Sequence, residues 1–151
     1  MDIETFIKRW TTGKGGQERA NYGLFLCELC DLLGVARPDP AEAESETNDY
    51  VLERAVKETA RDGSVSTKRI DLYKRNAFVL EAKQSSEKGA KKHGTAVRAT
   101  ASWDNAMTAA RTQAVTYAEH LEPSPPFVIV CDIGNCFDIY ASFDGSARYQ
   151  G

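Results

Sequence analysis

The feature that most constrains the fold is a pair of short runs in the middle of the chain. Residues 77–83 form a mostly apolar run that closes on two charged side chains, and residues 64–72 before it contain several β-branched residues. The polar residues 74–76 between the two runs are typical of a turn. Together the runs predict a β-hairpin.

Helical periodicity flanks this hairpin on both sides. Residues 17–34 carry leucine and phenylalanine at helical spacing and end at Gly34, a residue that commonly terminates a helix. Residues 102–121 return to the same periodicity, with apolar side chains every three or four positions. We therefore predict one helix before the hairpin and one after it.

Three further segments are interpreted as strands. Residues 50–58 are ambiguous, since Tyr50, Leu52 and Val56 suit one strand face while glutamate and alanine favour a helix; we favour the strand. Residues 127–131 and 136–141 predict two strands around a tight turn. Residues 37–48 and 84–100 are interpreted as loops. The order helix, three strands, helix, two strands predicts an α/β fold with a mixed sheet flanked by helices.

Charge is distributed unevenly along the 151 residues, a length typical of a single domain. The net charge is only −3, but nine lysines or arginines stand against three acids between Val65 and Arg98. Residues 39–49, by contrast, carry five carboxylates. A local basic face is the electrostatic footprint expected for binding phosphates, although charge alone favours a merely solvated surface.

No apolar run approaches the roughly 20 residues that a membrane-spanning helix needs. The acidic start Met1-Asp2-Ile3-Glu4 lacks the basic and apolar regions of a secretory signal. We expect a cytoplasmic protein.

Four cysteines raise the possibility of a zinc site. Cys27 and Cys30 lie three apart in an apolar helical run, and Cys131 ends an apolar strand. Buried free cysteines behave as small apolar side chains, so core packing is the interpretation that we favour.

The candidate site is Asp71, nine intervening residues, and then Glu81, Ala82 and Lys83. Because side chains alternate along a strand, Glu81 and Lys83 point the same way, and Asp71 reaches them from the partner strand. Two carboxylates, the backbone carbonyl of Ala82 and water form an all-oxygen site suited to Mg²⁺, which Mn²⁺ could replace. With Lys83 placed to orient water, this chemistry predicts hydrolysis of a phosphodiester.

Simpler interpretations of the same residues stay open. Each acid could be a solvated charge at a strand end, and Lys83 could pair with Glu81 or Asp71. The spacing alone is a weak pattern, and its value comes from falling on a predicted hairpin between helices.

Several segments carry a resemblance to a known family. They are Phe25-Leu26-Cys27-Glu28-Leu29-Cys30-Asp31-Leu32-Leu33-Gly34-Val35, Tyr50-Val51-Leu52-Glu53-Arg54-Ala55-Val56-Lys57, Arg69-Ile70-Asp71-Leu72-Tyr73, Val79-Leu80-Glu81-Ala82-Lys83, Gln113-Ala114-Val115-Thr116-Tyr117 and Pro126-Phe127-Val128-Ile129-Val130-Cys131-Asp132. In this order they resemble the N-terminal endonuclease domain of MmeI-like restriction–modification enzymes, which join an endonuclease to an adenine DNA methyltransferase in one polypeptide. The stretch from Lys88 to Trp103 is longer than usual in this family.

The resemblance implies a restriction-endonuclease-like core of the PD-(D/E)xK type, with Asp71, Glu81 and Lys83 as its motif and double-stranded DNA as the substrate. It also implies that the chain is the front of a longer protein, since nothing in it resembles a methyltransferase. The methyltransferase and target-recognition domains would be its partners, and S-adenosylmethionine would bind only there. A dimer could serve double-strand cleavage.

Other residues are candidates with two interpretations each. Glu18 matches the position of an additional metal-associated acid, or is a charge at a helix N-terminus. Gln113 and Tyr117 share a helical face that looks onto the site or onto the core edge. We assign DNA contacts to Gln84 and Ser85 and phosphate contacts to Lys68, Lys74, Arg75, Lys91 and Lys92, and treat His93 and His120 as surface residues.

Three functions are therefore in competition. The leading hypothesis is an Mg²⁺-dependent DNA endonuclease module whose sequence specificity lies elsewhere. The alternative is a catalytically silent DNA-binding or assembly domain of a defence-system methyltransferase. A zinc-binding interaction module comes third.

Overall fold

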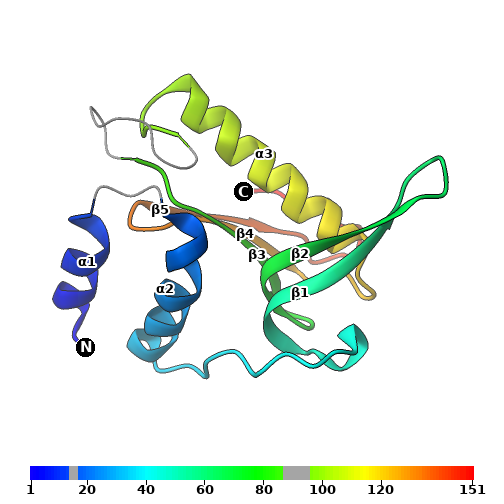
Figure 1. The fold of residues 1–151 in the computed structure, drawn as a ribbon, viewed down its shortest axis with the longest axis horizontal. Coiled ribbons are helices and arrows are strands. Elements are labelled where there is room, and N and C mark those ends of the chain that lie inside the picture. The colour runs from blue at the N-terminus through cyan, green and yellow to red at the C-terminus, as the bar shows by residue number, and fades with distance from the viewer. Residues whose placement is uncertain (14–16, 87–95) are drawn as a thin grey trace.

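The computed structural model describes residues 1–13, 17–86 and 96–151 of one α/β domain. In chain order its elements are α1 (Ile3–Thr11), α2 (Glu18–Leu33), the 3-10 helix η1 (Ser45–Thr47), β1 (Tyr50–Thr59), β2 (Val65–Lys74), β3 (Phe78–Lys83), α3 (Ala101–Glu119), β4 (Phe127–Asp132) and β5 (Cys136–Ala141). The strands form one sheet in the order β1-β2-β3-β4-β5, with α3 on one side and α1 and α2 on the other (Figure 1).

The sheet is mixed, as the sequence predicted. β3 and β4 run parallel, in register from Phe78 with Phe127 to Lys83 with Asp132, and every other neighbouring pair is antiparallel. Parallel neighbours cannot be joined by a tight turn, and α3 supplies the crossover between them. The crossover is what places β3 in the middle of the sheet, with a strand on either side.

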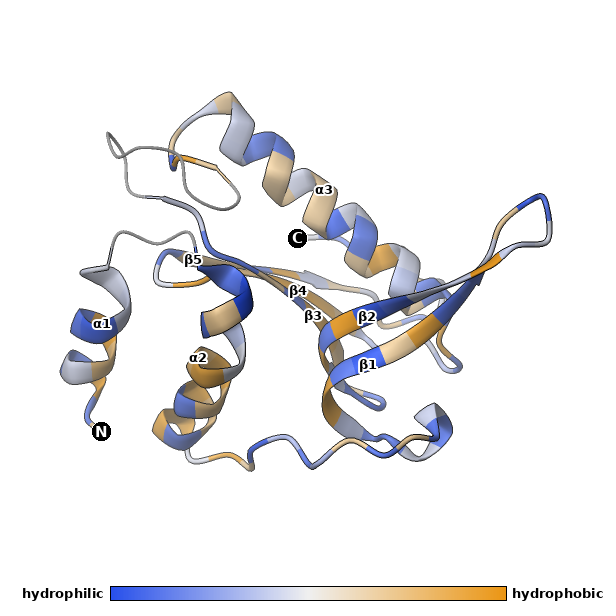
Figure 2. Cartoon of the chain, viewed as in Figure 1, coloured by the Kyte–Doolittle hydropathy of each residue, from blue (hydrophilic) through white to orange (hydrophobic). Residues whose placement is uncertain are grey.

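The two larger apolar clusters lie on opposite faces of the sheet, and both draw on β3 and β4. Figure 2 shows these strands as mostly hydrophobic along the ribbon. The α3-side core comprises Val56, Ile70, Tyr73, Val79, Ala114, Tyr117, Ala118, Leu121, Val128 and Tyr149. The α2-side core comprises Phe6, Phe25, Leu26, Leu72, Leu80, Ala82, Cys131 and Ile133. Such two-sided burial explains why residues 77–83 and 127–131 are almost continuously apolar in sequence.

The β1–β2 hairpin is kinked. We expected Tyr50, Leu52 and Val56 on one face, and this was wrong: Tyr50 and Leu52 pack on the α2-side core, whereas Val56 belongs to the α3-side core. The exchange of faces falls at Glu53, whose φ of 53° is left-handed. A local twist of this kind changes the direction of the neighbouring side chains. Asp71 lies opposite Glu53 on β2.

The helices follow the predicted pattern with one addition. α2 ends at Gly34, which has the left-handed φ of 68° expected for a helix C-terminus, and α3 lies within two residues of its predicted bounds. α1 was not predicted, although Asp2 caps it by accepting a hydrogen bond from the Thr5 amide at 2.8 Å. Within the described ranges, no helix is long and apolar enough to cross a membrane.

The strands also follow their predictions, with small shifts of their ends. β1 and β3 begin and end within one residue of the predicted bounds, and β2 runs on to Lys74. In the predicted loop 84–100, Ser86 forms an isolated bridge with Val97. Residues 87–95 of that loop lie outside the described residues.

The β4–β5 turn yields a test of how α1 is held. Gly134 is left-handed, with φ of 75°, and a Cβ at this position would collide with the backbone carbonyl of Trp10. Gly134→Ala is therefore expected to lower the free energy of unfolding more than Gly145→Ala. Both changes strain a left-handed residue, by about 1–2 kcal/mol, but Gly145 has open space around its α-carbon. Urea denaturation measures both losses, and equal losses would show that α1 moves aside without cost.

Candidate active site

Asp71 and Glu81 meet where the β2–β3 ladder stops. The regular pairing ends at Leu72 and Leu80, and beyond it Asp71 Oδ2 accepts a hydrogen bond of 2.8 Å from the backbone amide of Ala82. The Asp71 carboxylate thus replaces a backbone partner at the next position of the ladder. This substitution brings the Asp71 carboxylate against β3, the strand that carries Glu81.

Glu81 is a buried acid with an unused acceptor. Its residue is 2% exposed, and its Oε1 atom has no hydrogen-bond partner in the described part of the chain. Burial, and then the charge of Asp71, raises the pKa of Glu81 to about 8. Burial also raises the pKa of Asp71. A bound cation would relieve the cost of placing these two carboxylates side by side.

Lys83 lies on the same side of β3 as Glu81 and is held by an acid from α2. Its Nζ atom is 3.6 Å from Glu18 Oε1, and the other oxygen of Glu18 accepts a hydrogen bond of 3.3 Å from the Gln84 amide. Glu18 is the first residue of α2, so it lies at a helix N-terminus, and its pairing with Lys83 places it beside the site. The ion pair of Lys83 is with Glu18 rather than with Glu81 or Asp71.

The donor set fits a hard divalent cation. Asp71 and Glu81 offer carboxylate oxygens, and Ala82, which lies between Glu81 and Lys83 in the sequence, offers its backbone carbonyl oxygen. The Glu81 Oε1 atom, which has no hydrogen-bond partner among the described residues, is an acceptor that a cation would satisfy. Among the described residues no group of three or more histidine, cysteine, aspartate or glutamate side chains is arranged to hold a metal ion. Water would therefore have to supply much of the coordination, as is usual for Mg²⁺.

The residues that follow Lys83 are anchored inside the protein. Ser85 is 1% exposed and gives both its amide and its hydroxyl to Asp132, at 2.8 and 2.6 Å. Gln84 is also buried, and its side-chain oxygen accepts hydrogen bonds from Gln17 and Asn21. These bonds engage the Gln84 side-chain oxygen and the Ser85 hydroxyl, and they fix the end of β3; the DNA contacts assigned to both residues stay a prediction.

Asp132 is the centre of this anchor. Beyond Ser85, its Oδ2 accepts hydrogen bonds from Trp103 Nε1 at 2.9 Å and from Asn135 Nδ2 at 2.8 Å, and Arg98 Nε lies 4.0 Å away. Four charged or polar partners explain how a carboxylate that is 1% exposed is tolerated. Our sequence reasoning missed this role, although the position of Asp132 directly after an apolar strand resembles that of Glu81.

The structure brings together three of the other predicted site residues. Lys68 from β2 and Gln113 and Tyr117 from α3 line one open cavity of about 340 Å³. Tyr117 is itself buried in the α3-side core, and Gln113 donates a 2.6 Å hydrogen bond to its hydroxyl. Tyr117 is therefore a core-edge tyrosine that borders a cavity beside β2, and the contact of this pair with a phosphate stays a prediction.

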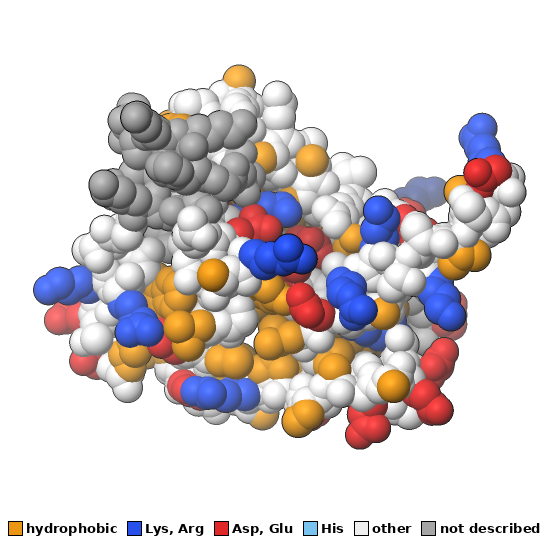
Figure 3. Space-filling model, in the orientation of Figure 1, with side chains coloured by type: hydrophobic (Ala, Val, Ile, Leu, Met, Phe, Trp, Pro, Cys, Tyr) orange, Lys and Arg blue, Asp and Glu red, His pale blue; other side chains and the backbone are white. Residues whose placement is uncertain are grey.

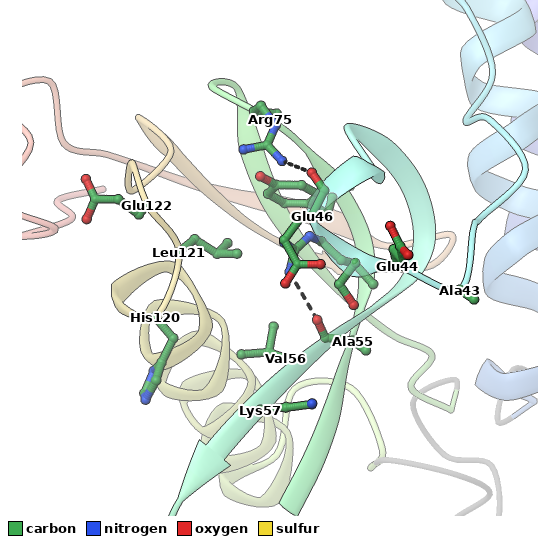
Figure 4. A pocket seen from close by; sticks show the side chains of 13 residues that line it. Ala43, Glu44, Glu46, Ala55, Val56, Lys57, Arg75, His120, Leu121 and Glu122 are labelled. Atoms are coloured by element: carbon green, nitrogen blue, oxygen red, sulfur yellow. Dashed lines mark hydrogen bonds between the residues drawn. The ribbon is translucent and has the colours of Figure 1, made fainter.

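Lys74 and Arg75 lie away from that cavity. The Nζ atom of Lys74 is 4.9 Å from the centre of the Tyr50 ring, and the Arg75 guanidinium pairs with Asp49. Arg75 also lines a cavity of about 460 Å³ near η1 and the end of α3, where Figure 4 shows it directed at the backbone of Glu46. Acidic side chains share that cavity with Arg54 and Lys57, so its lining carries both signs of charge. Lys91 and Lys92 lie outside the described residues.

Glu53 and Tyr22 were not anticipated as neighbours of the site. Tyr22 lies one helical turn after Glu18 on α2, and burial and the adjacent Glu53 carboxylate, with smaller effects from Asp71 and Glu81, raise its pKa. Glu53 is the left-handed residue of the kink and adds to the charge near Asp71. A glutamate inside the predicted strand 50–58 was the available signal, but a kink cannot be deduced from it.

The cysteines behave as expected from core packing. Cys30 and Cys131 are buried, Cys27 and Cys136 are half-buried, and all four are free thiols. Burial strongly raises the pKa of the Cys131 thiol, which keeps it protonated and unreactive.

The fold and the candidate site together indicate the class of protein. A mixed five-stranded sheet flanked by helices, with an acid on β2 facing an acid and a lysine on β3, is compatible with a PD-(D/E)xK-like core. The family model described as "MmeI, N-terminal domain" matches residues 1–148, and the chain therefore belongs to this family. No curated protein and no solved structure matches it. The resemblance noted in the sequence is confirmed, and it places the domain in restriction–modification enzymes.

The raised pKa of Glu81 predicts how stability depends on pH in the metal-free protein. Its pKa in the folded chain, about 8, lies above its ordinary value of 4.5. Between these two pH values the folded chain therefore binds more protons than the unfolded chain. The contribution of Glu81 is fully present below pH 4.5 and is lost as the pH rises through about 8. The free energy of unfolding of Glu81→Gln should therefore fall less than that of the parent chain as the pH rises across this window.

Urea denaturation in the presence of a chelator, at several pH values from about 4.5 to about 8, makes this measurement. Glu119→Gln, at an exposed position on α3, is the matched control and should leave the pH dependence unchanged. If Glu81→Gln unfolds with the same pH dependence as the parent chain, the buried acid does not carry the shift.

Proposed function

We propose that this domain is an Mg²⁺-dependent endonuclease that hydrolyses phosphodiester bonds of double-stranded DNA as the cleavage module of a restriction–modification enzyme. The observation that carries the proposal is the buried Glu81 carboxylate beside Asp71, whose Oε1 atom has no hydrogen-bond partner among the described residues, with Lys83 two residues further along the same strand. Two acids and a lysine in a mostly apolar sheet cost stability, and cation-assisted hydrolysis explains why all three occur together. Membership of the MmeI N-terminal family supports the same conclusion.

Asp71, Glu81 and the Ala82 carbonyl would hold the cation, and Glu18 is close enough to Lys83 to contribute an outer contact. Bound Mg²⁺ supplies a Lewis acid that polarises the phosphoryl group and lowers the pKa of its water; Mn²⁺ could replace it. The Lys83 ammonium would orient the attacking water and stabilise negative charge that develops on phosphorus. By pairing with Lys83, Glu18 would restrain the position of its ammonium group.

Other parts of the parent polypeptide would complete the activity. We place sequence recognition in a target-recognition domain and S-adenosylmethionine in a methyltransferase domain, because this domain shows features of neither. Double-strand cleavage would need two copies of the site, and hence a dimer. The protein would act on invading DNA in the cytoplasm.

The test combines cation binding with cleavage. Calorimetry with Mn²⁺ should show binding to the parent chain that Asp71→Ala or Glu81→Ala abolishes. Lys83→Ala should still bind the cation but cleave DNA slower by roughly 10²–10⁴-fold, because it removes the group that positions water and not the metal ligands. Glu119→Ala, an exposed acid on α3, serves as the control and should change neither measurement.

The outcomes separate the two leading functions. Cation binding that depends on both acids, together with cleavage that depends on Lys83, supports the endonuclease. A folded protein that binds DNA but no cation would instead be a catalytically silent DNA-binding domain. Cation binding that survives loss of both acids would contradict the proposed site.

A further inference from the structure

The outer part of the β1–β2 hairpin projects from the body of the domain (Figure 1). We call residues 57–69 the β1–β2 arm; every residue in it except Glu58 is exposed. The arm begins where the last hairpin residues buried in the α3-side core, Val56 and Ile70, leave that core. At about 3.3 Å per residue, the three further ladder pairs carry it about 10 Å outward before the turn.

The arm is a regular, closed hairpin up to its tip. The ladder continues to the pair formed by Thr59 and Val65. At the tip, the Ala60 amide donates to the Ser64 carbonyl at 2.8 Å, and the Gly63 amide donates to the Ala60 carbonyl at 3.0 Å. Its shape is therefore defined by its own backbone hydrogen bonds, although little apolar packing supports it.

Cations lie on both faces of the arm and at its tip. Lys57 and Arg69 point to one face and Lys68 to the other, because the register pairs Val56 with Lys68 and Ala55 with Arg69. Arg61 lies in the turn. Figure 3 shows basic side chains at the end of the arm and near its base. A ribbon that lies in a DNA groove meets a phosphate backbone on each side, and cations on both faces suit that position.

The arm also contains two acids, Asp62 and Glu58, which differ in how they reduce its positive charge. Asp62 is used locally, because its Oδ1 accepts a 2.8 Å hydrogen bond from the Ser64 amide and closes the turn. Glu58 lines the cavity shared with α3, away from the face that carries Lys57 and Arg69. The face that carries Lys57 and Arg69 thus holds no acid of the arm, whereas at the tip Asp62 stays charged beside Arg61.

The composition of the arm favours nucleic acid over a protein partner. Val65, at 61% exposed, is the large apolar side chain of residues 57–69, and the segment contains no aromatic residue. Cores of protein interfaces are enriched in aromatic residues and depleted in lysine. A two-stranded β-ribbon, by contrast, is one of the two elements that fit the major groove of B-DNA.

The base of the arm leads directly into the candidate active site. Lys68 and Glu58 face Gln113, Thr116 and Tyr117 of α3 across an open cavity of about 340 Å³. Asp71 follows Lys68 by three residues on the same strand. A duplex held by the arm would therefore contact β2, the strand on which Asp71 lies.

We propose that the β1–β2 arm inserts into a groove of the DNA duplex, so that Lys57, Arg61, Lys68 and Arg69 contact phosphates on both sides and hold the duplex over Asp71 and Glu81. This role rests on the proposed endonuclease function, since it concerns the same substrate at the same site. It assigns to the arm a binding role that is separate from cation binding and from catalysis.

The test is duplex binding with Ca²⁺ in place of Mg²⁺, measured by fluorescence anisotropy on a DNA duplex of random sequence over a range of salt concentrations. Lys57→Ala with Arg61→Ala is expected to weaken binding roughly tenfold and to reduce the slope of log Kd against log salt by about 2. Lys8→Ala with Arg148→Ala removes the same charge from exposed positions outside the arm and should change the slope little. Circular dichroism confirms that each variant is folded.

Equal losses in the two double variants, or no binding of duplex by the parent chain, would overturn the role of the arm. Calorimetry with Mn²⁺ on the same proteins keeps this failure distinct from failure of the proposed function. Arm variants should bind Mn²⁺ like the parent chain, because they leave Asp71 and Glu81 intact. Loss of DNA binding together with loss of Mn²⁺ binding would instead show that the substitutions damage the site itself.

Discussion

Two carboxylates placed side by side in a largely apolar sheet are the constraint on which the arrangement of this domain depends. Asp71 is stabilised by the Ala82 amide, and the ammonium of Lys83 lowers the pKa of both acids. Within the described part of the chain, these contacts leave one oxygen of Glu81 without a hydrogen-bond partner. Removing charges from water costs several kcal/mol for each ion, and the proposed cation would offset part of this cost.

The fold supplies the rigidity that such a site needs. The parallel pairing of β3 with β4 places Lys83 beside Asp132, and the amide of Ile133 donates to the Lys83 carbonyl at 2.7 Å. Asp132 then holds Ser85, so the end of β3 is fixed on both sides of the lysine. α2 contributes Glu18 from the opposite side. Asp71, Glu81 and Lys83 thus lie on strands whose positions are fixed by backbone hydrogen bonds and by the side chains of Asp132 and Glu18.

Much of this could be predicted from the sequence, because periodicity reports burial directly. The run that ends at Glu81 and Lys83 is almost continuously apolar because both faces of this central strand are covered, and the same pattern predicted it as a strand. The kink at Glu53 could not be predicted, since a left-handed glutamate depends on tertiary contacts and not on local preference. Nor could the burial of Ser85, a polar residue whose partner, Asp132, is 47 positions away. Long-range polar networks leave no periodic signal.

The central claim is that Asp71 and Glu81 share one divalent cation. The most direct measurement is a crystal structure of the protein soaked with Mn²⁺, with diffraction data collected to reveal the anomalous scattering of the metal. If the two acids share one cation, the data will show one strong anomalous peak within coordination distance, about 2.0–2.3 Å, of carboxylate oxygens from both residues. A well-occupied peak elsewhere, or a site where Glu81 stays unpaired at high Mn²⁺ concentration and high pH, would contradict it.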